Sequence, residues 1–313
     1  MTKETRAPVI VFAYNRPDHL TRTLTALAAA EGARATELWI FCDGPKPAEP
    51  RARIDVVHKV ADAPDWRAQF AAVQVVKAPQ NKGLARSVID GVSEVVARFG
   101  QVIVLEDDLL VAPDFLDFMN ACLAFYRADQ TIGSVTGFCP LPAVPDAYPH
   151  DVMALPRNCS HGWATWSDRW AEVDWSMSEA QRVLHDRALR RKLDAAGTDR
   201  AFRLRQQLRG RVNSWSIAFG LWHVLTDRAT IYPVENRVKN IGFDGSGVHT
   251  RAGQEVNAAL AETPRAFRLE HVAPDPNLVR AVRKVYSGSR HGQMRRQTIL
   301  TLEALIGRNA HGH

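Results

Sequence analysis

The sequence lacks the features of a membrane-spanning or a secreted protein. No segment approaches the roughly 18 to 20 consecutive apolar residues that a membrane span requires. The polar start before residues 8–13 has neither the long apolar region nor the small-residue cleavage site of a signal peptide. The 313 residues include only four cysteines, with no metal-ligand spacing, and three of these lie in apolar segments. This pattern predicts reduced thiols and a cytoplasmic protein.

Internal repeats and low-complexity segments are also absent, and the charge is not distributed as in a nucleic-acid-binding protein. The formal net charge is +6, but the excess is uneven. Arginines are frequent in residues 187–211 and 278–296, whereas the segment around Glu106 is acidic. A nucleic-acid groove is expected to be basic throughout. The sequence therefore predicts no nucleic-acid partner.

What the sequence does contain is a regular alternation of strand and helix patterns. Continuous apolar runs rich in β-branched residues, typical of buried parallel strands, alternate with segments in which apolar residues recur at helical spacing. The expected strands are residues 8–13, 37–42, 72–76 and 102–105, and the expected helices are residues 16–30, 51–60 and 84–99. This order predicts an α/β fold with a mainly parallel central sheet flanked by helices.

Polar residues directly follow three of these strands. Asp43 ends the second strand, residues 81–83 (Asn-Lys-Gly) follow the third, and Glu106-Asp107-Asp108, the acidic triplet, ends the fourth. In parallel α/β sheets, ligands bind beyond the carboxyl ends of the strands. We therefore expect these three segments to project toward one site.

The acidic triplet predicts a cation site. Neighbouring carboxylates resist joint ionisation unless positive charge lies among them. Mg²⁺ and Mn²⁺ prefer oxygen ligands, often one or two carboxylates together with substrate phosphates. A divalent cation at this position would neutralise a leaving nucleoside diphosphate when a sugar–phosphate bond breaks. The alternative is an acidic turn at the protein surface.

Residues 104–118 (VLEDDLLVAPDFLDF) resemble the metal-binding segment of the N-acetylglucosaminyltransferase I family, an inverting group that uses nucleotide sugars and has the GT-A fold. Further matches occur in the same order along the chain and extend the resemblance over about residues 8–250. Residues 81–86 (NKGLAR) also resemble the donor-side loop of bacterial family-2-type glycosyltransferases. The resemblance implies a GT-A catalytic domain that takes up most of the chain.

The proline-rich segment 136–162 suggests where the halves of this domain meet. We expect a catalytic domain over residues 1–250, with a nucleotide-sugar-binding half at 1–135 and an acceptor-binding half at 136–250. A basic helical tail is expected at residues 251–313. Because arginine and lysine interleave with apolar residues there, the tail could lie on an anionic membrane surface, pack on its own domain, or form a homodimer.

Carried over onto matching positions, the resemblance implies Mn²⁺ or Mg²⁺ as cofactor, with Asp108 as the direct metal ligand. The residues expected to line the donor site, at the nucleotide or its phosphates, are Ala13, Tyr14, Asn15, Arg16, Asp43, Lys82, Arg86, Glu106, Asp107 and His249. His249 is implied at the donor phosphate or the metal, but a lone histidine is more often structural. Alternative roles remain for three others. Asp43 can be a turn residue, and Lys82 and Arg86 can be surface charges at the start of a helix.

The general base of the resembling family has no counterpart in this chain. Where the family has acidic residues after a tryptophan, this chain has residues 215–217 (Trp-Ser-Ile), without a carboxylate. An inverting transfer needs a base within hydrogen-bond reach of the acceptor hydroxyl. The candidates, in order of preference, are Asp244, Asp168 and His161. Their structural alternatives are a turn aspartate, a helix cap and a polar loop residue.

Six tryptophans cluster between residues 163 and 222. Indoles stack on the apolar faces of sugar rings, but they also fill protein cores. We expect most of the six to be core residues, with Trp163 and Trp215 contacting the acceptor or the donor sugar.

Together these features predict an inverting, metal-dependent glycosyltransferase of bacterial surface glycan assembly, acting in the cytoplasm at the inner face of the membrane. The expected donor is a UDP-sugar, N-acetylglucosamine by family default, and the expected acceptor is a saccharide or lipid-linked saccharide. An inactive sugar-binding scaffold is one alternative, because the base is missing. A sugar-nucleotidyltransferase is another, although it would need a glycine-rich basic loop after the first strand.

Overall fold

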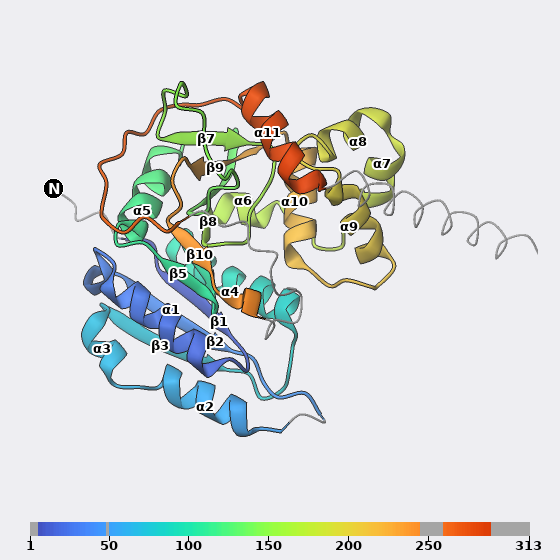
Figure 1. Ribbon diagram of the computed structural model, residues 1–313. Coiled ribbons are helices and arrows are strands. Elements are labelled where there is room, and N and C mark those ends of the chain that lie inside the picture. Colours follow the sequence, from blue (N-terminus) through green and yellow to red (C-terminus); the bar gives the residue numbers. More distant parts are fainter. Residues whose placement is uncertain (1–5, 48–49, 245–258, 289–313) are drawn as a thin grey trace, which may run out of the picture.

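The computed structural model describes residues 6–47, 50–244 and 259–288, and an eight-stranded sheet forms its centre (Figure 1). The strand order is β3-β2-β1-β4-β8-β6-β9-β7. The strands of this sheet are β1 (Val9–Ala13), β2 (Glu37–Cys42), β3 (Ala72–Lys77), β4 (Gln101–Glu106), β6 (Ile132–Thr136), β7 (Val152–Leu155), β8 (Trp163–Trp166) and β9 (Ala229–Pro233). A separate antiparallel ribbon pairs β5 (Leu109–Val111) with β10 (Val238–Asn240).

The first four strands of the sheet run parallel. β1 lies between β2 and β4, with Ala13 opposite Cys42 and Phe12 opposite Glu106, and β2 pairs in turn with β3. The carboxyl ends of these strands therefore meet at one edge. The predicted α/β class, with a mainly parallel sheet flanked by helices, is confirmed, and so are the seven strands and helices expected up to residue 105.

Both faces of this part of the sheet are covered. The connecting helices are α1 (Pro17–Ala29), α2 (Ala52–Ala61), α3 (Asp65–Gln69) and α4 (Leu84–Phe99), followed by α5 (Phe115–Phe125). Val9 and Val11 of β1 pack into the core that includes α1 and α5, whereas Ile10 packs into the core that includes α4. Because β1 is buried on both faces, its sequence is continuously apolar and does not alternate.

The second half of the sheet is mixed. β8 runs antiparallel to β4, with Trp166 opposite Gln101 and Trp163 opposite Val104. The helices that follow β8 are α6 (Ser167–Ala171), α7 (Ala180–His185), α8 (Arg187–Leu193), α9 (Asp199–Leu208) and α10 (Trp215–Leu225). Helix α6 stays beside the sheet, and α7 to α10 form a lobe next to it (Figure 1). The proline-rich segment expected to be loop contains the short strand β7.

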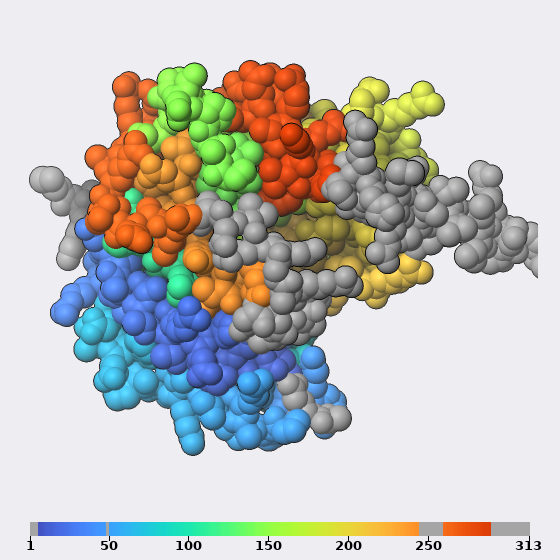
Figure 2. Space-filling view, viewed as in Figure 1, coloured from blue at the N-terminus to red at the C-terminus, as the bar shows by residue number. Residues whose placement is uncertain are grey.

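The C-terminal part of the described chain packs on the sheet. Residues 259–275 contain no helix or strand, and Phe267 packs against the main core. Helix α11 (Pro276–Ser287) buries Leu278 and Val282 against residues of the second half of the sheet. Figure 2 shows both parts, in orange and red, lying against the rest of the protein. Within the described residues, the expected tail is thus an extended segment followed by one helix that packs on its own domain.

The tail residues 289–313 lie outside the described residues. In the described part of the chain, no helix is both long enough and apolar enough to cross a membrane. The four cysteines are all unpaired, and Cys42, Cys122 and Cys139 are buried.

Candidate functional site

The acidic triplet lies at the carboxyl edge of the sheet, beside the residues that follow β1. Glu106 is opposite Phe12, so residues 14–16 run past Asp107 and Asp108. The Tyr14 backbone N–H donates to Asp107 Oδ2 at 3.4 Å. The Arg16 guanidinium donates to Asp107 and lies 3.0 Å from Asp108 Oδ2. The structure therefore brings the opening loop and the triplet together, as the sequence predicts.

Two carboxylates of the triplet, Asp107 and Asp108, are held out of water, whereas Glu106 is half-buried. Asp107 and Asp108 are only 3% and 5% exposed. Burial raises the pKa of Asp107 to about 6, although the Arg16 charge opposes this rise. Burial and the charges of Asp108 and Asp107 raise the pKa of Glu106 to about 8. One guanidinium thus compensates three carboxylates incompletely, and an additional cation would favour their ionised forms.

One oxygen of the triplet is suited to bind such a cation. Asp108 Oδ1 is buried and accepts no hydrogen bond from the described residues. Leaving a buried acceptor unsatisfied is costly, and a metal ion would remove that cost. The described residues contain no group of three or more histidine, cysteine or acidic side chains placed to hold a metal. Asp108 therefore fits a Mg²⁺ or Mn²⁺ ion that takes its other ligands from phosphates and water.

The segment after β10 closes over Asp108. The Ile241 N–H donates to the Asp108 carbonyl at 2.8 Å. A Cβ atom on Gly242 would lie 2.2 Å from Asp108 Oδ2, so only glycine fits there without displacing the carboxylate. Sequence reasoning missed Gly242, because its proximity depends on the pairing of β5 with β10, which are more than 120 residues apart.

Two predicted site residues follow Gly242 closely in the sequence. Asp244 ends the 3₁₀ helix η2 (Gly242–Asp244), so its backbone follows Gly242 by two residues. Its side chain lies outside the described part of the structure, and so does all of His249. Their proposed roles therefore stay predictions.

Asp43 ties two strand ends together. Its carboxylate accepts four hydrogen bonds, from the Gly44, Lys82 and Gly83 amides and from Asn81 Nδ2, at 2.8 to 2.9 Å. These bonds use all the acceptor sites of the carboxylate. They favour the turn role of Asp43 over the predicted direct contact with a nucleotide. Ala13 belongs to the same junction, because its carbonyl accepts the Asp43 N–H at 2.9 Å.

Lys82 and Arg86 share one partner at the start of α4. Lys82 Nζ lies 3.3 Å from Asp90, and Arg86 Nε lies 2.8 Å from the same carboxylate. Both cationic side chains are exposed, and such pairs contribute little to stability. Asn15 lies in the loop between β1 and α1, next to Tyr14, whose ring is 5.4 Å from Lys46 Nζ.

The prediction of Asp168 as the base is wrong. It lies two residues beyond Trp166, which pairs with Gln101 at the amino end of β4, about 16 Å of strand away from the triplet. Its exposed carboxylate contacts Arg169 at 2.6 Å and Gln130 at 3.3 Å. The reason is that β8 is antiparallel to β4, so the residues that follow β8 emerge at the opposite edge of the sheet.

The prediction that Trp163 and Trp215 contact a sugar is also wrong for this structure. The two rings stack on each other, with centroids 4.6 Å apart, and are 1% and 3% exposed. Phe219 packs against Trp163 at 5.5 Å. Their faces are therefore already occupied by core contacts, and the expectation that most of the cluster is core extends to both.

His161 lies on the same side as the triplet. It precedes Gly162 and Trp163, and Trp163 is opposite Val104 near the end of β4. His161 Nδ1 is buried and has no hydrogen-bond partner among the described residues. Burial lowers the pKa of His161, and the nearby Asp108 charge opposes that change. Of the two predicted bases with described side chains, only His161 is close to the donor-side carboxylates.

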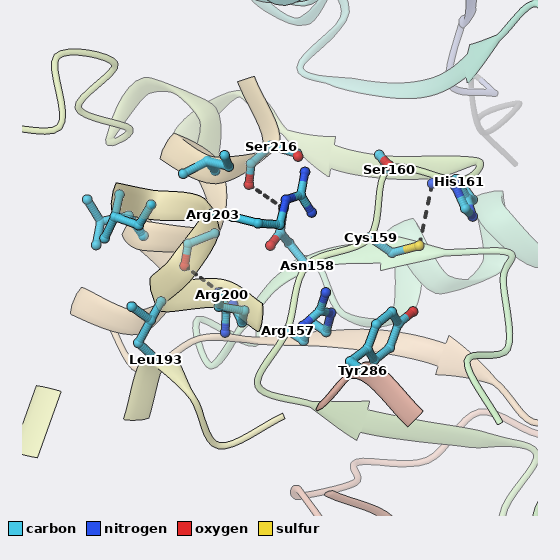
Figure 3. Close-up of a pocket in the computed structure, with 14 residues that line it drawn as sticks. Arg157, Asn158, Cys159, Ser160, His161, Leu193, Arg200, Arg203, Ser216 and Tyr286 are labelled. Atoms are coloured by element: carbon cyan, nitrogen blue, oxygen red, sulfur yellow. Dashed lines mark hydrogen bonds between the residues drawn. The ribbon is translucent and has the colours of Figure 1, made fainter. Parts of the chain in front are cut away.

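A cavity of about 160 Å³ opens beside His161 (Figure 3). It is bounded by the segment between β7 and β8 and by helices α9, α10 and α11. The lining includes Ser216 and Ile217 at the start of α10. Three arginines also line it: Arg157, Arg200 and Arg203. Sequence reasoning noted the arginine-rich stretch around residue 200 but did not assign it to a site.

The comparisons with known proteins bear on the half of the chain that contains the triplet. Residues 9–140 match the family model described as Glycosyl transferase family 2. No curated protein matches the chain. The family-2 match spans β1 to β6, and therefore includes the opening loop and the triplet. The relationship to the N-acetylglucosaminyltransferase I family is not among these findings.

Three solved structures that are similar to this chain share only low sequence identity with it. An active-site mutant of LgtC is 12% identical over 72% of this chain and 72% of that chain, with a TM-score of 0.38. TarS from S. aureus is 11% identical over 73% of this chain, with a TM-score of 0.39, and the match spans 36% of TarS. The galactosyltransferase LgtC in complex with donor and acceptor sugar analogues is 11% identical over 72% of this chain and 86% of that chain, with a TM-score of 0.33.

Proposed function

We propose that this protein is an inverting, metal-dependent glycosyltransferase that moves a sugar from a nucleotide-sugar donor to a hydroxyl of a saccharide acceptor. The observation that carries the proposal is Asp108, which has a buried, unsatisfied carboxylate oxygen within the segment that matches glycosyl transferase family 2. A strand end of this kind suits a ligand with phosphates and a cation.

The donor side is assigned to the residues around the triplet. Asp108 would hold Mn²⁺ or Mg²⁺, and the cation would neutralise the negative charge of the leaving nucleoside diphosphate. Arg16 fixes the orientations of Asp107 and Asp108. Lys82 and Arg86 are exposed and share only Asp90, so either can turn to a donor phosphate at small cost. UDP-N-acetylglucosamine is the donor that we propose to test first.

The acceptor side is assigned to His161. In an inverting transfer, the acceptor oxygen attacks the anomeric carbon while the bond to the diphosphate breaks and a base takes the hydroxyl proton. Burial lowers the pKa of His161 and so keeps its imidazole neutral and able to accept a proton at neutral pH. Asp244 is the second candidate, because its backbone follows Gly242 beside Asp108.

The tail is proposed to contact an anionic membrane, which would suit a lipid-linked acceptor at the inner face of the membrane. Helix α11 turns its apolar residues inward and exposes Arg280, Arg283 and Lys284. Each basic residue near an anionic surface adds about 1 kcal/mol of attraction. The competing proposal is a homodimer formed through the same segment. In that case the molecular mass of the protein in solution would increase with protein concentration.

A thermal-shift screen of nucleotide sugars with and without Mn²⁺ tests the proposed function. A ligand that binds the native state raises the melting temperature by mass action. We expect UDP-sugars to raise it only when Mn²⁺ is present, and we expect slow hydrolysis of the donor that binds. Binding without hydrolysis or transfer would favour the inactive scaffold, and binding of nucleoside triphosphate with sugar phosphate would favour a nucleotidyltransferase.

A further inference from the structure

The cavity beside His161 contains more positive charge than the protein neutralises. Arg157 forms a bidentate pair with Asp199, at 3.0 and 2.9 Å, and its guanidinium lies 3.7 Å from the centre of the Tyr286 ring. This arginine is therefore fully engaged. Asp199 neutralises one of the three arginines that line the cavity.

The other two arginines have no anionic partner of their own among the described residues. Arg200 is 8% exposed and donates to two neutral acceptors, the carbonyls of Pro156 at 2.8 Å and Gly220 at 2.9 Å. Arg203 reaches the cavity from one turn further along α9; its side chain is exposed, it lies near Asp199, and no hydrogen bond or ion pair is seen for it within the described ranges. Arg200 is therefore a buried charge without an ion pair, which is unfavourable, and Arg203 adds a second positive charge at the open side of the cavity. The cavity is thus suited to an anion.

The rest of the lining is suited to a sugar ring. Asn158, Ser160 and Ser216 bring amide and hydroxyl groups to the cavity, and His161 closes one side (Figure 3). The volume of about 160 Å³ is close to that of a cavity that accepts a single benzene ring, roughly 150 Å³. One six-membered ring or one phosphate group therefore fits.

We propose that this cavity binds an anionic group of the acceptor, a carboxylate or a phosphate, with Arg200 and Arg203 as its counter-ions. The inference rests on the proposed function, because His161 joins the cavity to the Asp108 side of the protein. Arginine binds both carboxylate and phosphate in a bidentate manner. The acceptor is thus assigned to the class of acidic or phosphorylated saccharides.

The test measures binding of three probes to the full chain by calorimetry, with UDP and Mn²⁺ present. The probes are D-glucuronate, D-glucose 6-phosphate and D-glucose. We expect at least one anionic probe to bind about tenfold more tightly than glucose, since a charge-assisted hydrogen bond contributes enough for that ratio. The probe that binds more tightly identifies the anion as carboxylate or phosphate.

Two variants locate the binding site. Arg203→Gln removes a charge without breaking any hydrogen bond among the described residues. It should weaken binding of the anionic probe about tenfold but leave binding of glucose unchanged. Arg205→Gln is the matched control, because Arg205 lies on the same helix but does not line the cavity. Melting temperatures confirm that both variants fold.

Three results would overturn the proposal. These are equal binding of glucose and both anions, unchanged anion binding by Arg203→Gln, and displacement of the anion by excess UDP, which would place the cavity in the donor site. Binding of UDP with Mn²⁺ to the unmodified protein is measured separately. If UDP does not bind, the proposed function is contradicted. If UDP binds normally but neither anion binds, only the proposed anion-binding role of the cavity is contradicted.

Discussion

At the scale of single residues, the donor site depends on how tightly Asp108 is held. Its carbonyl is fixed by Ile241, one carboxylate oxygen faces Arg16, and the other is left for a ligand. Gly242 borders the same carboxylate so closely that no side chain fits. The orientation of Asp108 Oδ1, the oxygen proposed to bind the metal, is therefore set by Ile241, Arg16 and Gly242.

Gly242→Ala should impair transfer while the protein still folds. The added Cβ would meet Asp108 Oδ2 at 2.2 Å and must push the carboxylate away from Arg16. We expect at least a tenfold loss in kcat/KM for the donor, because a small misplacement at the reacting centre is costly. Gly210→Ala is the control. No atom lies within 4 Å of its added Cβ, and its φ of +67° should cost about 1 kcal/mol of stability without loss of transfer.

His161→Gln should slow the transfer step about a hundredfold or more, the usual contribution of a positioned base. Donor binding, measured by calorimetry with UDP and Mn²⁺, should stay within a factor of two or so, because the ligands of the donor phosphates are unchanged. Asp168→Asn is the control and should keep full activity, since Asp168 lies at the opposite edge of the sheet. A loss below tenfold for His161→Gln would move the base assignment to Asp244.

At the scale of secondary-structure elements, the sequence predicts the first half of the fold well. The strands β1, β2 and β4 are buried on both faces, so their apolar runs stand out, and Gly100 adopts the left-handed conformation that ends α4. The parallel pairing then places Arg16 beside the triplet, which is why that part of the site could be predicted.

The remaining elements depend on contacts that no local pattern reveals. β7 has only four residues and lies in a proline-rich segment. β10 pairs with β5, although the two strands are more than 120 residues apart in the sequence. Residues 259–275 follow the surface without regular structure. Strand direction cannot be read from residues 163–166, so Asp168 was placed at the wrong edge. A buried indole and a sugar-binding indole look alike in sequence, so Trp163 and Trp215 were misassigned.

Helix α10 makes a pH-dependent contact with the sheet. His223 lies between Ser134 Oγ of β6, at 3.2 Å, and the Arg228 carbonyl, at 3.0 Å. Burial, with smaller effects from the Arg200 and Arg228 charges, lowers the pKa of His223 to about 3. An unfolded histidine titrates near 6.5. The unfolded state therefore binds the proton first as the pH falls, and stability is full above pH 6.5 and decreases toward pH 3.

The expected consequence is a difference between the unfolding curves of two variants. Between pH 7 and 4.5, protonation of the unfolded state at this position should remove about 2 to 3 kcal/mol of unfolding free energy. His223→Gln should lack this component, whereas the exposed His185→Gln should retain it. Urea denaturation at both pH values provides the measurement. Parallel pH profiles for the natural protein and His223→Gln would contradict the buried neutral histidine.

At the scale of the whole molecule, helix α11 contributes both to the cavity and to a hydrophobic core. Tyr286 of α11 lines the cavity, and Leu278 and Val282 complete the core beneath it. A truncation before α11 would therefore expose apolar surface and open the cavity. The membrane proposal must be tested with the helix in place.

Co-sedimentation with liposomes tests the membrane contact. The full chain should bind anionic vesicles at low salt and be released at high salt, because the attraction is screened. A chain that ends at Gly288 should lose much of this binding, and replacing Arg280, Arg283 and Lys284 by glutamine should weaken it further. Equal binding to neutral vesicles, or no effect of either change, would show that the tail serves another purpose.

The central claim is that Asp108 joins a divalent cation to a nucleotide at the carboxyl edge of the sheet. Calorimetric titration of UDP into the natural protein and into Asp108→Asn, each with and without Mn²⁺, tests it most directly. We expect Mn²⁺ to strengthen UDP binding at least tenfold in the natural protein, which corresponds to about 1.4 kcal/mol, and to have little effect in the variant. UDP binding that is independent of Mn²⁺, or equally strengthened by Mn²⁺ in Asp108→Asn, would contradict the claim.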